Sequence, residues 1–326
     1  MSTRRAVRSG GPLARTRSLS RRGFLTGAAA TAVAAGLAAC GGRTSPVSSA
    51  AGSTRSAGSR GTLTIGAIPD QDPEVLQRLY GTVADSMTKA LGLDVSYRPV
   101  TDYGAAVSLF RTGDLDLVWF GGLTGVQARL QTRGAQVIAQ RDIDESFHSV
   151  FVVNTSTGLT ASADLTELAD LRFTYGSQTS TSGFLMPAYF LSQQHVDPRG
   201  FPGGPGYSGS HDATLQLVAS GSYQAGVLNE QVWNSRSQAG TVDPSVVLYN
   251  RTAAFHDYHW VLGPTAVDRL GKDLPGRLRD YFLGLSVDDA AQKAVLDLFG
   301  AQRFIATKDA NYDQIEQIGE QLGLIS

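Results

Sequence analysis

The most informative stretch of this sequence is Tyr175-Gly176-Ser177-Gln178-Thr179-Ser180-Thr181-Ser182-Gly183. It follows a predicted strand at 172–175 and precedes the apolar run Phe184-Leu185-Met186, where we expect a helix to begin. Five hydroxyl side chains lie between its first and last glycines. At a helix start, hydroxyls, unpaired backbone N–H groups and the helix dipole favour binding of an oxyanion without a net positive charge. Ordinary N-capping by a Ser/Thr-rich loop explains the same residues equally well.

Strands and helices are predicted to alternate on both sides of this stretch. The expected strands are 62–68, 95–98, 115–120, 137–140, 149–153, 172–175, 224–228, 246–248 and 259–262. The expected helices are 73–91, which Asp72-Pro73 starts, 103–110, 124–131, 163–168, one after Gly183, and 211–220, followed by a mainly helical tail from about 265. This pattern indicates an α/β fold with mainly parallel sheets. Two series joined by two crossings suggest a two-lobed clamshell with the ligand cleft between its lobes.

Four regions follow from these expectations. Residues 1–40 form a signal peptide, 41–60 a flexible linker, 61–155 the first lobe, to which 262–326 return, and 156–261 the second lobe. The linker is dominated by Ser, Gly, Ala, Thr and Arg and shows no apolar periodicity.

The N-terminus has the features of an export signal. Seven arginines and no acid precede residue 23, and an alanine-rich apolar run follows them. Ser20-Arg21-Arg22-Gly23-Phe24-Leu25 matches the twin-arginine export pattern, and Leu37-Ala38-Ala39-Cys40 matches the lipobox of bacterial lipoproteins. We expect Cys40 to be lipidated and the chain to lie in the cell envelope, anchored to the outer face of the cytoplasmic membrane. An uncleaved signal anchor is the alternative, although the run is short for a membrane span.

Composition excludes several classes of function. Without the seven signal arginines, 21 Lys and Arg face 29 Asp and Glu, a net charge of −8, so no nucleic-acid partner is expected. Cys40 is the only cysteine, which excludes an intrachain disulfide and a multi-cysteine metal site. We expect neither a metal nor a cofactor, and a monomer.

Three further segments offer binding groups at predicted strand ends. In Gly206-Tyr207-Ser208-Gly209-Ser210-His211-Asp212, Ser210 can cap a helix and His211 can donate to the same anion. Trp119-Phe120-Gly121-Gly122-Leu123-Thr124 allows close approach of backbone to a ligand, or is simply a tight turn. Thr101-Asp102-Tyr103 brings a phenol to the same edge, unless Tyr103 is only a half-buried aromatic residue.

The histidines and serines do not form a recognisable catalytic or metal site. In His256-Asp257-Tyr258-His259, the two imidazoles would point to different faces of an extended segment, so we expect them to line the cleft. The chain has no G-x-S-x-G elbow, no phosphate-binding P-loop and no H-E-x-x-H motif. Hydroxyl clusters without an evident base favour binding over turnover, and we expect no enzyme.

With these motifs, the sequence resembles the phosphate/phosphite/phosphonate-type substrate-binding proteins of ABC transporters, which share the type II periplasmic-binding fold. The resemblance covers the chain after the linker. It rests on Ile68-Pro69-Asp70, Val100-Thr101-Asp102-Tyr103, Asp114–Gly122, Ser180-Thr181-Ser182-Gly183 and Ser208-Gly209-Ser210-His211. Two more stretches, Phe120–Arg129 and Gln140-Arg141-Asp142-Ile143-Asp144 with Phe147-His148-Ser149, resemble a branch labelled as selenate-transporter binding proteins.

The resemblance implies a set of ligand-binding residues. It assigns the oxyanion to Tyr103, Thr179, Ser180, Thr181, Ser182 and His211. His148 stands where phosphonate binders place a tyrosine, and Glu230 and Asp257 match acids that bind the amine of an aminophosphonate. Because phosphate and phosphite retain a proton near neutral pH, an acid facing the anion would favour a phosphorus ligand, whereas a donor-only pocket would suit selenate or sulfate.

The sequence therefore predicts a lipid-anchored binding protein that captures a small oxyanion and delivers it to an ABC permease and its ATPase. Donors from both lobes would satisfy the anion, and the transporter would recognise the closed form. An exported enzyme on the same fold and a ligand sensor for a membrane receptor are the alternatives.

Overall fold

The computed structural model describes residues 61–325 of the 326-residue chain. The predicted signal peptide, Cys40 and the linker 41–60 lie outside the described residues. Between residues 61 and 325, no helix combines the length and the apolar character needed to cross a membrane. This part of the chain contains two five-stranded sheets and one two-stranded sheet.

The first sheet is built mainly from the N-terminal third of the described chain. Its strand order is β2-β1-β3-β11-β4, and β1 runs parallel to β2 and β3, whereas β11 runs antiparallel to β3 and β4. The strands are β1 (Leu63–Ala67), β2 (Val95–Tyr97), β3 (Leu117–Phe120), β4 (Gln136–Val137) and β11 (His259–Leu262). The accompanying helices are α1 (Pro73–Leu91), α2 (Tyr103–Thr112), α3 (Gly122–Gln131), α7 (Pro264–Leu270), α8 (Leu274–Leu283) and α9 (Ala290–Phe299).

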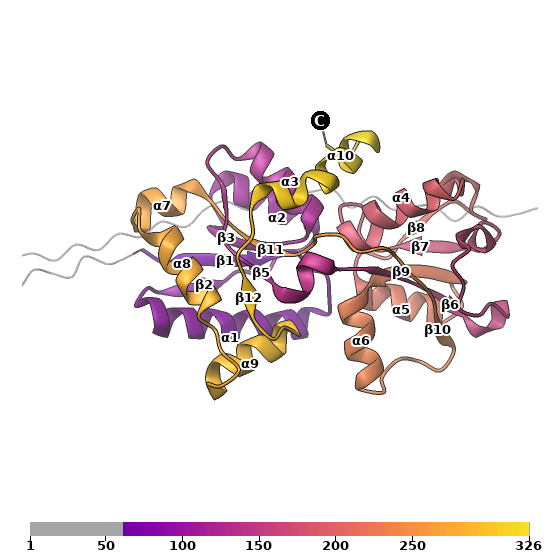
Figure 1. The fold of residues 1–326 in the computed structure, drawn as a ribbon, viewed down its shortest axis with the longest axis horizontal. Helices are drawn as coiled ribbons and strands as arrows, with labels where there is room; N and C mark the ends of the chain where they lie inside the picture. Colours follow the sequence, from indigo (N-terminus) through magenta and orange to yellow (C-terminus); the bar gives the residue numbers. More distant parts are fainter. Residues whose placement is uncertain (1–60, 326) are drawn as a thin grey trace, which may run out of the picture. The chain divides into compact units, whose positions relative to one another are not determined.

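The second sheet has the strand order β10-β6-β9-β7-β8. Strand β6 is antiparallel to β9 and β10, and β7 is parallel to β8 and β9. The strands are β6 (Ser149–Asn154), β7 (Phe173–Tyr175), β8 (Gly206–Tyr207), β9 (Ala225–Asn229) and β10 (Val246–Arg251). Helices α4 (Met186–Gln193), α5 (His211–Ala219) and α6 (Glu230–Gln238) accompany this sheet (Figure 1).

Helix α1 shows how local sequence fixes an element of the first core. Asp72 occupies the N-cap position and Pro73 the first turn, where its missing N–H group is not needed. Leu76, Leu79, Tyr80, Val83 and Met87 recur at helical spacing and are buried. The helix ends at Gly92, whose φ of 60° lies in the left-handed region that favours glycine. The predicted helix 73–91 is confirmed.

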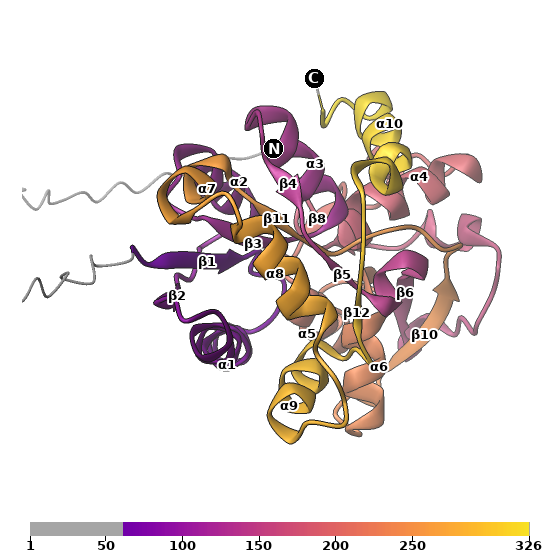
Figure 2. The same cartoon turned by 60° about the vertical axis from the view of Figure 1, so that its left-hand side comes forward.

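Several elements of the C-terminal part of the chain contact elements of the first sheet and its helices. Helices α8 and α9 contact α1, and Figure 2 shows these orange and yellow helices near the indigo N-terminal elements. Strand β12 (Phe304–Ile305) pairs with β5 (Gln140–Arg141), and α10 (Asp313–Gln321) packs on α3.

Two expectations about the sheets are wrong. The sheets are mixed rather than mainly parallel, because the strands next to the crossings, β6 and β11, run against their neighbours. Strand β6 was expected in the first lobe, which was to end at 155, but it pairs within the second sheet. The chain has already crossed before β6 begins, since Phe147 pairs with Phe255 of the return crossing. The exact limits of the two lobes stay a prediction.

Two short elements also differ from expectation. The expected strand 137–140 is divided into β4 and β5, which pair with different partners, β11 and β12. The expected helix 163–168 is a single 3₁₀ turn over Leu165–Leu168, for which the Asp164 side chain accepts the N–H of Thr166.

Candidate functional site

The N-terminus of helix α3 brings two oxygen atoms from distant parts of the chain together. Gly122 N–H donates to Asp257 Oδ1 at 2.9 Å, and Leu123 N–H donates to Thr181 Oγ1 at 2.9 Å. A Cβ at Gly121 would lie 3.2 Å from both oxygens, so glycine permits this close approach. The first turn of α3 is thus occupied by acceptors that complement its dipole.

Asp257 is a buried acid with one free oxygen. Its side chain is fully buried, and Oδ2 has no hydrogen-bond partner within residues 61–325. Burial raises the pKa of Asp257 to about 7, although the N–H group of Gly122 and the hydroxyls of Thr181 and Ser182 oppose this shift. The carboxyl group is therefore able to exchange a proton near neutral pH.

The Ser/Thr stretch forms the start of a helix, and its hydroxyls do different things. Ser180 Oγ caps the turn by accepting Gly183 N–H at 2.9 Å, so the capping interpretation is correct for this residue. Thr181 Oγ1 is used by Leu123. Ser182 Oγ is buried and has no hydrogen-bond partner among the described residues. Residues 181–185 form a π-helical turn that continues into α4, an irregularity often found at functional sites.

Tyr103 contributes a buried phenol from the start of α2. Asp102 caps this helix by accepting Ala105 N–H, and the Tyr103 side chain points inward, with 2% exposure. Its Oη lies close enough to Ser180 for that hydroxyl to oppose the rise in its pKa that burial causes. Even so, Oη makes no hydrogen bond of ordinary geometry in the described chain. Burial keeps this phenol protonated and able to donate.

Tyr103, Ser182 and Asp257 together form what we call the buried polar cluster. Asp257 interacts electrostatically with Tyr103, and the Ser182 hydroxyl lies close enough to the Asp257 carboxyl to oppose the rise in its pKa. Each of the three presents a buried polar atom that has no hydrogen-bond partner within residues 61–325, at Oη, Oγ and Oδ2. Such atoms are costly unless another molecule satisfies them. The cluster offers two hydroxyl donors and one carboxyl group to that molecule.

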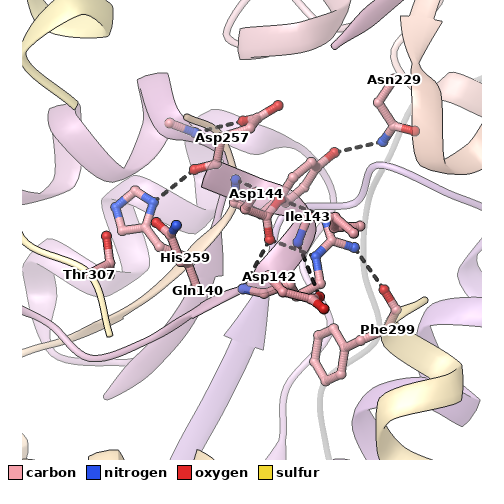
Figure 3. A network of polar contacts seen from close by, with 12 residues as sticks. Gln140, Asp142, Ile143, Asp144, Asn229, Asp257, His259, Phe299 and Thr307 are labelled. Carbon is pink, nitrogen blue, oxygen red and sulfur yellow. Dashed lines mark hydrogen bonds and ion pairs between the residues drawn. The ribbon is translucent and has the colours of Figure 1, made fainter. Parts of the chain in front are cut away.

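A second network lies beside the cluster and includes two residues that sequence reasoning missed, Tyr258 and Asp70. Tyr258 Oη donates to Asp70 Oδ2 at 2.8 Å and accepts from Asn229 Nδ2 at 2.9 Å. Figure 3 shows Asn229 and Asp257 entering the site from separate elements. Burial raises the pKa of Asp70 to about 6, although the hydrogen bond from Tyr258 opposes it. The one signal for Tyr258 is its place next to Asp257, just before strand β11.

His211 belongs to this second network. Its Nδ1 accepts Asn229 N–H at 3.3 Å, so its Nε2–H faces Tyr258 Oη at 3.3 Å. Burial lowers the pKa of His211 to about 4, which makes it a neutral donor at pH 7. Its own backbone N–H donates to Asp70 O, which joins α5 to the first sheet. His211 thus does not belong to the buried polar cluster itself. It contacts Tyr258, the residue that follows Asp257 of the cluster.

Three other predicted residues lie elsewhere. His148 Nδ1 donates to Thr252 O at 2.7 Å, and its Nε2 lies 4.0 Å from Glu230, which pairs with Arg251. Thr179 is half-buried, and its N–H lies 3.5 Å from Ser177 Oγ. No hydrogen bond within residues 61–325 joins His148 or Glu230 to the Ser/Thr stretch.

The histidines of the return strand are used in packing. His259 is fully buried, stacks on Tyr312 at 3.9 Å between ring centroids, and donates through Nδ1 to Asp257 O. In the part of the chain that the structure describes, no three His, Cys, Asp or Glu side chains gather as a metal site.

Comparison with known proteins gives a consistent set of relatives. Residues 65–312 match the family described as "ABC transporter, phosphonate, periplasmic substrate-binding protein". The probable ABC transporter phosphite binding protein PhnD1 of Prochlorococcus marinus is 47% identical over 81% of this chain and 90% of its own length. A phosphonates-binding periplasmic protein of Escherichia coli is 31% identical over 40% of this chain and 39% of its own.

Solved structures agree with these sequence relatives. The structure of PhnD1 in complex with methylphosphonate superposes with a TM-score of 0.79 and 46% identity, covering 81% of this chain and 99% of that one. A binding protein component of a phosphonate transporter from Pseudomonas aeruginosa gives a TM-score of 0.70 at 20% identity, over 79% and 85% of the two chains. The two-lobed type II periplasmic-binding fold expected from the sequence is confirmed.

Proposed function

Because the chain belongs to the periplasmic substrate-binding proteins of phosphonate ABC transporters, we propose that its buried polar cluster binds one small phosphorus oxyanion. The protein is an extracytoplasmic component of such a transporter. The observation that carries the proposed ligand class is that Tyr103, Ser182 and Asp257 lie near one another and each has a buried polar atom with no partner among residues 61–325. Methylphosphonate, found in the PhnD1 complex, and phosphite, named for that protein, are the leading candidates.

The carboxyl group of Asp257 supports a ligand that carries a proton. A monoprotonated phosphonate or phosphite can donate its hydroxyl hydrogen to Oδ2, while its other oxygens accept from Tyr103 Oη and Ser182 Oγ. Sulfate and selenate carry no proton at neutral pH, so Asp257 would itself have to take up a proton to bind them, and as a carboxylate it would repel them. The site therefore favours phosphorus ligands over the selenate suggested by one branch of the family.

Further contacts come from the surrounding groups. The first N–H groups of the helix that starts at Thr181 have no acceptors within that helix and favour an anion. Tyr258, whose hydroxyl donates to Asp70 and faces His211, follows Asp257 in the chain and borders the site. Among the residues implied by the family resemblance, Tyr103, Ser182 and Asp257 are our proposed ligand-binding set, with Thr181 as the link to α3 and Ser180 as the cap.

Closure joins the two sheets around the ligand. Contacts from Leu123 to Thr181, from His211 to Asp70 and from Asp72 to Asp212 link elements of the first sheet to elements of the second. We infer that the lobes separate to admit the anion and that the permease and ATPase use the closed form. The twin-arginine signal would export the protein, and a lipid on Cys40 would anchor it at the membrane.

Calorimetric titration of the purified protein with methylphosphonate and sulfate tests the proposed function. Binding of methylphosphonate without turnover supports a transport protein, whereas conversion of a phosphonate or a phosphate ester would support the enzyme alternative. Regulation of a membrane receptor by the loaded protein would instead support the sensor.

A further inference from the structure

Arg141 and Asp144 form a buried ion pair that the proposed ligand contacts do not include. Arg141 Nε donates to Asp144 Oδ2 at 2.6 Å, and Arg141 Nη2 donates to Oδ1 at 2.8 Å. Arg141 is 3% exposed and Asp144 is fully buried. The remaining nitrogen, Nη1, donates to Phe299 O at 2.9 Å, the contact drawn in Figure 3. We call these two residues the buried pair.

Aromatic rings enclose the guanidinium of the buried pair. Its central carbon lies 5.0 Å from the ring centroid of Tyr258, 5.4 Å from that of Trp119 and 5.7 Å from that of Phe147. Burial lowers the pKa of Arg141, but the adjacent Asp144 carboxylate raises it by more than burial lowers it. The guanidinium therefore stays charged. The pair is thus fixed by bidentate geometry and by stacking.

Asp144 holds the backbone of both site residues on the return crossing. Its carbonyl oxygen accepts Asp257 N–H at 3.1 Å, and its Oδ1 accepts Tyr258 N–H at 3.3 Å. The next residue along, His259, begins β11. Asp144 therefore fastens the backbone of the segment that presents Asp257 to the cluster, beside the Phe147–Phe255 bridge and the Gly122 N–H. Arg141 orients the Asp144 carboxylate.

The buried pair is poorly explained as a source of stability. The cost of desolvating two charges offsets much of their attraction, so well-packed apolar residues often stabilise a core equally well. Orientation of hydrogen-bond acceptors is what an apolar replacement could not supply. We propose that Arg141 and Asp144 are positioning residues for ligand binding, which hold the segment that aims the Asp257 carboxyl at the oxyanion. This inference rests on the proposed function.

The test replaces both charges at once, because removing one would leave the other buried and unpaired. The variant is Arg141→Met/Asp144→Leu. Its matched control is Arg269→Met/Asp116→Leu. Arg269 and Asp116 form an ion pair at 2.6 Å, and the Asp116 side chain also accepts a backbone N–H, that of Thr64 in the first sheet. Affinity for methylphosphonate is measured by calorimetry from pH 5 to 9, and folding by thermal unfolding.

We expect the Arg141→Met/Asp144→Leu protein to unfold cooperatively, to bind methylphosphonate at least ~10-fold more weakly, and to show a shifted midpoint in its pH profile. The control pair should keep both the affinity and the pH midpoint. Wild-type affinity with a wild-type pH profile in the Arg141 variant would overturn the inference. If that variant does not fold, the affinity of Arg141→Lys tests the positioning role instead, because a lysine keeps the charge but loses the bidentate contact. Unchanged affinity in Arg141→Lys would equally overturn it.

Failure of the proposed function can be told apart from failure of this inference. If the wild-type protein binds no phosphorus oxyanion, hydrogen exchange in the ligand-free protein still reports on positioning. The amides of Asp257 and Tyr258 should then exchange about tenfold faster in the Arg141→Met/Asp144→Leu variant than in the control pair. Equal exchange rates would contradict a positioning role.

Discussion

Thr181 Oγ1 accepts the backbone N–H of Leu123 at 2.9 Å, so a side chain that follows a strand of the second sheet occupies the N-terminus of a helix of the first. The neighbouring hydroxyl, Ser182 Oγ, has no such partner in the described chain. Two adjacent residues of one stretch therefore have different roles. Thr181 joins the sheets, and Ser182 is free to donate to a ligand.

Ser182→Ala should weaken methylphosphonate binding while leaving the free protein as stable as before. The Ser182 hydroxyl makes no hydrogen bond of ordinary geometry with any residue that the structure describes. We expect affinity to fall by ~10-fold or more and the unfolding free energy to change by less than about 0.5 kcal/mol. Calorimetry and urea unfolding measure the two quantities, with Ser177→Ala as the control in the same stretch.

Thr181→Ala should differ from Ser182→Ala by affecting stability as well. It leaves the buried N–H of Leu123 without its acceptor, which costs roughly 1–3 kcal/mol. Replacing both residues should weaken binding by orders of magnitude while the protein still folds. Undiminished affinity in the double variant would remove this stretch from the site.

Asp257→Asn should change which anions bind. Asparagine can still accept from Gly122, but its amide donates where the carboxyl accepted. We expect methylphosphonate affinity to fall by at least ~10-fold and sulfate affinity to rise, because a donor-only pocket suits an unprotonated anion. Competition calorimetry gives both constants, and exposed Asp197→Asn is the control. If Asp257→Asn keeps the wild-type ratio of methylphosphonate to sulfate affinity, Asp257 does not distinguish protonated from unprotonated ligands.

Asp257 should also leave a signature in the pH dependence of the ligand-free protein. Its pKa is raised to about 7, so the native state binds this proton more tightly than the unfolded chain does. As pH rises from about 4 to 7, Asp257 therefore lowers stability, by up to ~1.4 kcal/mol per pH unit. His211 and His259, with pKa values lowered to about 4 and about 3, act in the opposite direction below pH 6.5.

Comparison with Asp257→Asn isolates this effect from the histidines. The unfolding free energy of wild type minus that of Asp257→Asn should fall between pH 5 and pH 7 and level off above pH 8. Urea unfolding at each pH measures it. A difference that is flat across this range would mean that Asp257 is not a raised-pKa carboxyl.

Arg236 should control how long the lobes stay closed. It contacts Asp212 at 2.7 Å and Asp72 at 3.3 Å, away from the buried polar cluster. Arg236→Gln should speed ligand release by roughly threefold to tenfold, and equally for methylphosphonate and phosphite, because a partly exposed pair is screened by solvent. Stopped-flow fluorescence measures release, with Arg199→Gln as the surface control. Release that is unequal for the two ligands would place Arg236 in ligand recognition instead.

Cys40→Ala tests the proposed lipid anchor. The variant should appear in the soluble fraction of the cell envelope, whereas wild type should sediment with membranes and partition into detergent. Membrane association that survives the substitution would count against the lipobox.

The sequence predicted most of the helices because their caps and apolar periodicity are local. Asp72-Pro73 and Gly92 bound one helix, and Asp102 and Gly113 bound another. Caps and periodicity could not predict the direction of β6 or the sheet to which it belongs. Pairing partners depend on where the chain crosses, and the crossing is fixed by the Phe147 and Phe255 pair, residues far apart in sequence.

The candidate site was predicted unevenly for the same reason. Tyr103, Thr181 and Ser182 stand next to helix starts, where strand and helix signals are visible. His148 and Glu230 looked equally polar, but the structure directs them toward Thr252 and Arg251. Tyr258 gave no independent signal, because its role depends on Asp70 and Asn229, which only the folded chain brings to it.

The central claim is that a buried acid selects a protonated phosphorus oxyanion, and calorimetric competition between methylphosphonate and sulfate at pH 7 tests it most directly. We predict one methylphosphonate bound per chain, with sulfate and selenate weaker by at least ~100-fold, because a site built to accept a ligand proton rejects an anion that lacks it. Sulfate or selenate binding as tightly as methylphosphonate would contradict the account.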